Sequence, residues 1–556
     1  MWRHTPGRSF VTGVEGADQN LPDPEVRMAD SASAAARGGV ATHPILPPPP
    51  SQARVTPALE PPLVRPLRPV VARRILAGAI GLGLLFQALF VGQLAGLNVP
   101  LWVAGVIATG WLLAPRPSRV RRSDVWLPAA ALTFAALVAV RANPALVAFD
   151  LVAAVTLTAA SLAAFAGAAV TTRSLAGLSL LVGQGLALTA AGTLHVGPAR
   201  RGLRGTAPAL SGGGRAVLAG MLLAVPLVAM FAALFASADA VFGSMVAGLA
   251  DVRPDLGDVP GRMVVAAAVA WCAGGLLVLV VAATRRVRRE PAPLGLRLGP
   301  VEATVVLVAV DLVFAAFVAI QAGYLFGGMD TAAASGLGYA QYARRGFFEL
   351  VAVAALAGAV VVALESVVAD RRRAYRVAAI ALVALTGVVL LSAGVRMALY
   401  QDAFGWSELR FFVVAAIAWL ALCLVAAAVG IATGRSRALP AAIGVLGLVV
   451  ALGVNLVDPG SFIAEQNLRR AADPAAVPTG GSTGLDVAYL AGLGPDAVPA
   501  LVSALPTLPP QQRAAVEAAL EDQRAALQRQ VATSGWPSWN RSRERALAAL
   551  APLTGP

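Results

Sequence analysis

Lysine is absent from this sequence, and all 44 basic residues are arginine. They outnumber the 30 acidic residues and give a formal net charge of +14. Without lysine, the chain cannot form a P-loop that holds phosphate with a lysine, nor a Schiff base on a lysine amine. Arginine cannot replace lysine in the second role because its guanidinium does not deprotonate in proteins. Whole classes of lysine-dependent chemistry are therefore excluded.

Cysteine and histidine are scarce. Cys272 and Cys423 both lie in apolar runs, and the only histidines are His4, His43 and His195. These residues can form neither a disulfide framework nor a zinc motif. A Ser/His/Asp triad would need His195, and no G-x-S-x-G turn lies near it. We therefore expect no metal site, no cofactor and no catalytic residues, and the sequence leans away from an enzyme.

Charged residues make up only 13% of the chain, against 58% hydrophobic residues, which is typical of a membrane protein. Long apolar stretches without period-two alternation predict transmembrane helices rather than a barrel. The predicted fold is an all-α polytopic bundle of about eleven spans in a lipid bilayer, within residues 75–456. The expected spans are 75–94, 98–114, 125–140, 145–168, 216–236, 263–283, 300–326, 347–369, 377–398, 411–432 and 438–456.

Segment 174–196 is long enough to span the membrane but carries Gln184 between two glycines. If it is interfacial or re-entrant, the loops assigned to the cytoplasm hold 24 arginines and the outer loops before the tail hold six. If it spans, the later arginine clusters fall outside, against the positive-inside rule. We therefore expect a membrane protein with a cytoplasmic N-terminus and an extracytoplasmic C-terminus.

Two tails flank the predicted bundle. Residues 1–70 lack an apolar run and are rich in proline from residue 44 onward, which predicts a disordered, extended cytoplasmic tail. Residues 459–556 are polar, and we expect an extracytoplasmic tail of short helices. Val516, Leu520, Leu527 and Val531 share one face of the longest, and Asn540 is the expected N-cap of the last.

Ionisable residues inside the spans carry an energetic cost and need a reason to be there. Asp311 lies about eleven residues into its span, near the membrane midplane. It either binds an ion, proton or ligand, or it is a protonated or hydrogen-bonded carboxyl that joins helices. Asp150, Glu302 and Glu365 are expected near span ends, where snorkelling or local pairing explains them.

The densest group of polar residues is predicted at the outer face, where one span begins and the next ends. The candidate ligand-binding residues there are Arg344, Arg345, Glu349, Arg396, Tyr400, Glu408 and Arg410. Arginines that meet carboxylates at one depth could bind an anionic lipid head group or a small anion. The alternative is that they are interfacial charge pairs and aromatic anchors that fix helix depth.

Several segments carry a resemblance to a known family. They are the stretch from Glu302 to Leu350 with its motif YARRGFFEL, the motif RMALYQDAFGWSELR, NLVDPGSFIAEQNLRRA after the last span, LDVAYLAGLGPDAVPAL and WPSWNRSRERAL. The chain resembles bacterial multi-pass proteins of the domain-of-unknown-function 4153/4173 type over most of its length after residue 75. The resemblance implies an inner-membrane protein with no assigned activity.

Three functions remain open at this stage. The leading hypothesis is a transporter-like or signalling component that works through the outer-face cluster. The second is a membrane enzyme on a lipid-linked substrate, with Glu349 or Glu408 as acid or base. The third is a scaffold that recruits protein partners through its tails. We expect no nucleic-acid partner.

Overall fold

The computed structural model describes residues 67–114, 120–191, 259–283, 298–326, 347–368, 371–473, 475, 477, 481 and 484–553. Over these residues every regular element is helical and there is no β-strand. The helices belong to one unit, Pro61–Pro556. The predicted all-α class is therefore confirmed.

The apolar helices fall on the predicted spans and on segment 174–196. They are α1 Pro69–Phe90, α2 Asn98–Leu113, α3 Leu127–Val138, α4 Pro144–Phe165, α5 Leu175–Ala191, α8 Val259–Ala282, α10 Pro300–Phe326, α13 Phe347–Val367, α14 Arg373–Phe404, α15 Glu408–Ala432 and α16 Leu439–Val457. Eight of the described helices are long and apolar enough to cross a membrane. The chain is a multi-pass membrane protein in a lipid bilayer.

Some boundaries differ from the prediction. α1 begins at Pro69, inside the segment assigned to the N-terminal tail, because proline is favoured in the first turn of a helix. α3 has 12 residues and is shorter than the expected span. α14 has 32 residues and runs to Phe404, beyond the expected end at residue 398. The predicted span 216–236 and residues 1–66 of the N-terminal tail lie outside the described residues.

Segment 174–196 forms α5 over most of its length, and α5 packs against α8. The Trp271 indole donates to the Ala190 carbonyl at 3.1 Å. Gly275 of α8 lies where a Cβ atom would collide with the Leu188 carbonyl, so this glycine permits the close approach of the two helices. The interfacial or re-entrant position of segment 174–196 stays a prediction.

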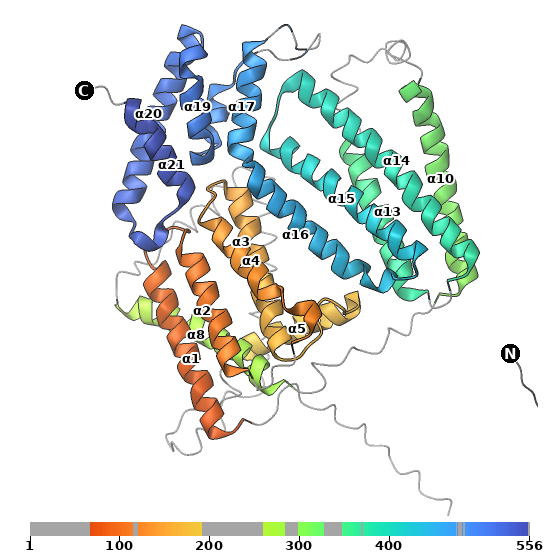
Figure 1. The fold of residues 1–556 in the computed structure, drawn as a ribbon, viewed down its shortest axis with the longest axis horizontal. Helices are drawn as coiled ribbons and strands as arrows, with labels where there is room; N and C mark the ends of the chain where they lie inside the picture. Colours follow the sequence, from red (N-terminus) through yellow and green to blue (C-terminus); the bar gives the residue numbers. More distant parts are fainter. Residues whose placement is uncertain are drawn as a thin grey trace, which may run out of the picture. The chain divides into compact units, whose positions relative to one another are not determined.

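The membrane helices form two packed groups. The first core is built by α1 to α5 together with α8, and the second by α10, α13, α14 and α15. α16 packs along α15 and also contributes Ala451 to the first core, so it joins the two groups (Figure 1).

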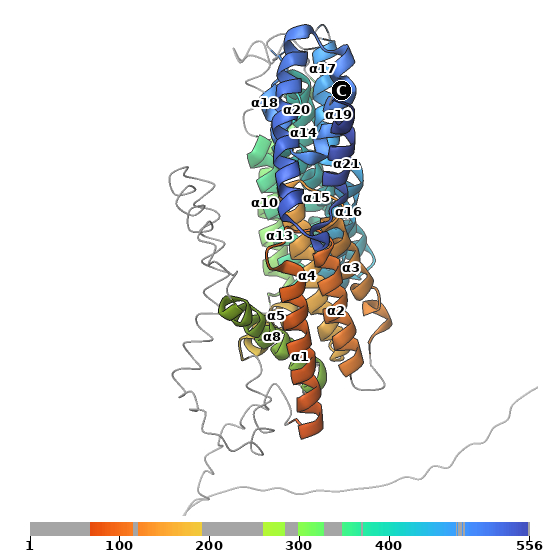
Figure 2. The same cartoon turned by 90° about the vertical axis from the view of Figure 1, so that its left-hand side faces the viewer.

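The C-terminal tail is helical, as predicted, and begins with a helix that the sequence analysis did not predict. Its helices are α17 Pro459–Ala472, α18 Val487–Gly492, α19 Val498–Ala504, α20 Pro510–Thr533 and α21 Arg541–Leu550. Figure 2 shows them gathered at one end of the membrane helices. Their core includes Leu146 of α4, Phe411 of α15 and Val454 of α16. Tail and bundle therefore share one apolar core.

The predicted details of the tail are mostly present. Asn540 caps α21, and its side chain accepts a hydrogen bond from the Arg543 amide at 3.2 Å. Val516, Leu520 and Leu527 are buried in α20. Val531 was expected on the same face, but it is 51% exposed because it lies in the last turn of α20, beyond the buried stretch.

Candidate functional site

The turn between α3 and α4, residues 139–143, is held by the tail. A single oxygen of Asp496, Oδ2, accepts hydrogen bonds from the backbone amides of Ala142 (2.9 Å) and Asn143 (2.8 Å). The Asn540 side-chain amide donates to the carbonyls of Val138 (3.0 Å) and Arg141 (2.9 Å). Tail residues thus form the hydrogen bonds that the amides and carbonyls of this turn require.

Arg141 links the same turn to the junction of α16 and α17. Its guanidinium pairs with Asp458 and also donates to the Asn455 carbonyl, and both charged side chains are nearly buried. Asp458 has a φ of 61°, in the left-handed region that aspartate tolerates better than most residues. Burial and the nearby Asp496 raise the pKa of Asp458, while Arg141 opposes the shift. We name Arg141, Asn143, Asp458, Asp496 and Asn540 the docking network.

The candidate residue Glu408 lies beside this network. Asn143 caps α4 by accepting from the Leu146 amide at 3.1 Å, and its own amide group donates to the Glu408 carboxylate. The Glu408 backbone amide donates to the Tyr489 hydroxyl at 2.8 Å. Glu408 therefore connects α15, the α3–α4 turn and the tail.

Asp150 makes a buried polar contact between α4 and α16. It is fully buried in α4, and the Asn455 side chain of α16 donates to its Oδ1 at 2.9 Å. Its second oxygen has no hydrogen-bond partner among the described residues. The sequence analysis explained Asp150 by local pairing near a span end, but its partner is 305 positions away. It joins α4 to α16.

A group of arginines surrounds the turn that ends α14. Arg410 donates to the carbonyls of Phe404 (3.0 Å) and Gly405 (2.6 Å), and its guanidinium lies 4.2 Å from the centre of the Tyr400 ring. Arg470 of α17 donates to the Ala403 carbonyl at 2.6 Å. These contacts satisfy carbonyls that a helix end leaves without partners.

Arg396 lies one helical turn before Tyr400 on α14. Its guanidinium donates to Gln321 of α10 at 3.1 Å, and the same oxygen accepts from the Ser392 hydroxyl at 3.3 Å. We name Arg396, Arg410 and Arg470, together with Tyr400, the arginine cluster. Arg470 was not singled out from the sequence; it occurs in the quoted segment NLVDPGSFIAEQNLRRA.

The remaining candidate residues are placed as follows. Glu349 is exposed in the first turn of α13, and Arg344 and Arg345 lie outside the described residues. Asp311 lies in α10 and is half-buried; one of its oxygens is buried and has no partner among the described residues. Their roles as ligand-binding and intramembrane polar residues stay predictions. No group of three or more His, Cys, Asp or Glu side chains within the described part of the chain could hold a metal ion.

Residues 129–504 match a family described as a domain of unknown function, DUF4153. The chain belongs to the DUF4153 family. No curated protein and no solved structure matches the chain.

The DUF4153 match runs from α3 into the end of α19, so it includes most of the docking network and the whole arginine cluster. It excludes α1, α2, α20 and α21. Asn540 and the tail residues that follow it therefore lie outside the matched segment.

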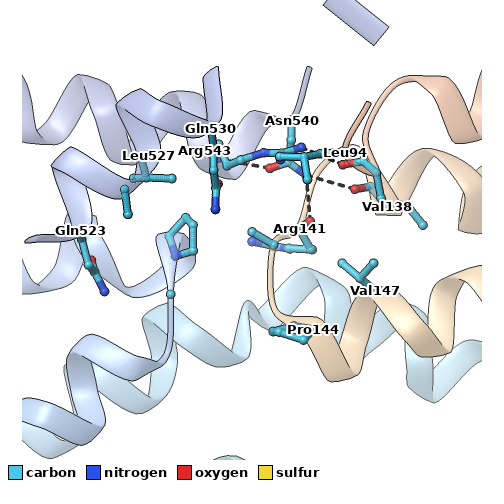
Figure 3. Close-up of a pocket in the computed structure, with 15 residues that line it drawn as sticks. Leu94, Val138, Arg141, Pro144, Val147, Gln523, Leu527, Gln530, Asn540 and Arg543 are labelled. Carbon is cyan, nitrogen blue, oxygen red and sulfur yellow. Dashed lines mark hydrogen bonds between the residues drawn. The ribbon is translucent and has the colours of Figure 1, made fainter. Parts of the chain in front are cut away.

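A cavity of about 390 Å³ lies between the α3–α4 turn and the tail helices. The residues that line it are Leu94, Ala95, Val138, Arg141, Ala142, Pro144, Val147, Gly494, Pro495, Gln523, Ala526, Leu527, Gln530, Asn540 and Arg543. Figure 3 shows Arg141 and Arg543 extending into the space between the α3–α4 turn and the tail helices. We name this space the tail cavity. Sequence reasoning missed it because its walls come from segments about 400 residues apart.

Proposed function

We propose that this DUF4153 protein is a transporter-like or signalling component of a bacterial inner membrane, which binds an anionic ligand or lipid head group at the arginine cluster. The N-terminus is cytoplasmic and the tail is extracytoplasmic. The arginine distribution supports this orientation, since turns 139–143 and 405–407 contact the tail, whereas arginines gather at the opposite helix ends.

The surplus of positive charge at the arginine cluster carries the proposal. Burial and the neighbouring charge of Arg410 lower the pKa of Arg470, and the carboxylate that opposes this is Asp402, which is exposed. Two guanidinium groups held close together on backbone carbonyls repel each other. A bound anion would relieve this repulsion, and guanidinium groups suit phosphate and carboxylate groups.

Lipid-dependent thermal stability of the full-length chain in neutral detergent tests the proposal. Phosphatidylglycerol should raise the Tm of the parent protein more than phosphatidylcholine does, because a ligand that binds the folded state stabilises it. Arg470→Gln and Arg396→Lys should each raise the apparent Kd for phosphatidylglycerol about tenfold, since a charge-assisted or forked contact is lost. Inorganic phosphate as the added ligand distinguishes a small anion from a lipid.

Arg469→Gln is the matched control, because the neighbouring Arg469 on α17 has a side chain that is 71% exposed and that pairs with Glu465 at 3.4 Å. This variant should behave like the parent. If Arg470→Gln and Arg396→Lys keep the full response to both phosphatidylglycerol and phosphate, the arginine cluster only anchors the helices and the proposal is wrong.

A further inference from the structure

The residues that line the tail cavity differ in character from those of the arginine cluster. Most of its lining is apolar, and the described residues that line it include two arginines and neither Asp nor Glu. Its volume is at the lower end of the range of small-molecule sites, roughly 300–1000 Å³. Such a cavity fits a single apolar chain better than a two-chain phospholipid.

Arg543 supplies an available positive charge in the tail cavity. Its Nη2 donates to the carbonyls of Ala95 and Ser538, both at 2.7 Å, which fixes the guanidinium in place. Among the described residues, its Nε and Nη1 have no hydrogen-bond partner and no carboxylate pairs with it. Arg141, the other arginine of the cavity, is already paired with Asp458. Burial lowers the pKa of Arg543, so an anion at this position would replace lost solvation.

The tail cavity lies beside the ends of the apolar helices α1, α3 and α4, where the boundary of the membrane is expected. Leu94 follows the end of α1, and Val138 and Val147 lie where α3 ends and α4 begins. Trp536 and Trp539 are 68% and 44% exposed beside the same boundary. The tail segment that carries them is bound to the α1–α2 turn, where the Leu97 amide donates to the Trp539 carbonyl at 3.0 Å. Exposed tryptophans at helix ends are typical of the lipid–water interface.

We propose that the tail cavity binds a long-chain carboxylate from the membrane. The carboxylate accepts a hydrogen bond from Nη1 of Arg543, and the alkyl chain lies against Val138, Val147 and Leu527. Lipid molecules reach the cavity because its walls include the ends of membrane helices. The site shares no residue with the arginine cluster and does not depend on what that cluster binds.

Native mass spectrometry of the full-length chain in neutral detergent, with oleate as the probe, tests this site. One oleate should bind per chain at saturation, and oleyl alcohol, which has the same chain without the charge, should bind at least about tenfold more weakly. Arg543→Gln should raise the Kd for oleate about tenfold. Arg541→Gln, which changes an exposed arginine of the same helix, should leave the Kd unchanged.

Ala526→Phe tests the apolar part of the tail cavity without touching Arg543. It places a ring in the cavity from α20 and should abolish oleate binding while the helical circular dichroism stays that of the parent. Equal binding of oleate and oleyl alcohol, unchanged binding by Ala526→Phe, or no bound oleate would each overturn the proposal. Arg470→Gln should leave oleate binding intact, so failure here and failure of the arginine cluster are distinguishable.

Discussion

Arginine takes three different roles at the helix ends that face the tail, and the differences come from the group that each guanidinium contacts. Arg141 pairs with a nearly buried carboxylate, Arg410 and Arg470 donate to carbonyls at the end of α14, and Arg543 keeps two nitrogens free of protein partners among the described residues. A guanidinium has five donors in a planar fork, so it can serve carbonyls and an anion at once. This explains how a chain without lysine builds each of these contacts.

Asp496 gives the sharpest residue-level test of the docking network. It is buried, and one oxygen accepts from two backbone amides of the α3–α4 turn. Asp496→Ala leaves both amides without an acceptor. This should lower the free energy of local opening of the turn by about 3 kcal/mol, which corresponds to a roughly 100-fold rise in the opening equilibrium constant. Hydrogen exchange of a peptide covering residues 139–143 should accelerate by that factor.

Asp522 provides the control for this measurement, because it is an exposed aspartate of α20. Asp522→Ala should leave exchange in residues 139–143 as it is in the parent. Equal exchange rates in the Asp496→Ala variant and the parent would mean that the tail does not hold this turn in solution.

At the scale of elements, the junction of α16 and α17 shows how one residue serves two helices. Asp458 ends α16 in a left-handed conformation and caps α17, whose first residue is Pro459. The same cap and proline pattern starts α4 at Asn143 and Pro144. Both pairs follow the end of an apolar helix, so the direction of the chain changes at the membrane boundary.

Asp458 also predicts a pH dependence. Because its pKa is raised above the ordinary 3.8, the folded state binds its proton more tightly than the unfolded state does. This contribution stabilises the folded protein at low pH and is lost as pH rises through the raised pKa. The Tm of the parent relative to Asp458→Asn should therefore increase as pH is lowered from about 7 toward about 4.

Asparagine tolerates the left-handed conformation, so Asp458→Asn keeps the backbone of the junction. Thermal melts of both proteins across this pH range make the comparison. As a control, the Tm of Asp522→Asn should change with pH in the same way as the Tm of the parent. A difference between Asp458→Asn and the parent that stays constant or shrinks on acidification would contradict the assigned burial of Asp458.

The sequence predicted elements better than contacts, for a physical reason. The length of an apolar run follows from membrane thickness, so α10 matches its predicted bounds and α2 ends one residue early. The cap of α21 at Asn540 is likewise a local signal. The tail cavity and the Asp150–Asn455 contact depend on which helices become neighbours. Neither periodicity nor composition contains that information.

At the scale of the whole unit, the tail ties membrane helices that are distant in sequence. It binds the α1–α2 turn through Ser538 and Trp539, the α3–α4 turn through Asp496 and the α14–α15 turn through Asn467. Since these turns belong to both packed groups of helices, a movement of one group relative to the other would strain the tail. A ligand in the tail cavity would therefore contact the segment that links the two groups, and it could affect their relative movement.

The orientation of the bundle is the prediction on which the extracytoplasmic role of the tail depends. Two exposed positions test it: Thr433, which follows the end of α15 away from the tail, and Asp522, which lies in α20 of the tail. Each is changed to cysteine in a chain whose Cys272 and Cys423 are replaced by serine. In spheroplasts, a membrane-impermeant maleimide should label Asp522→Cys, whereas Thr433→Cys should react only after permeabilisation.

The expected pattern follows from the arginine distribution, because the loops assigned to the side of Thr433 hold 24 arginines against six in the outer loops. Both positions are exposed in the folded protein, so a difference in labelling reports the side of the membrane rather than burial. A third position, Glu290→Cys, should behave like Thr433→Cys. Labelling of Thr433→Cys in intact spheroplasts, with protection of Asp522→Cys, would invert the orientation and place the arginine cluster and the tail cavity in the cytoplasm.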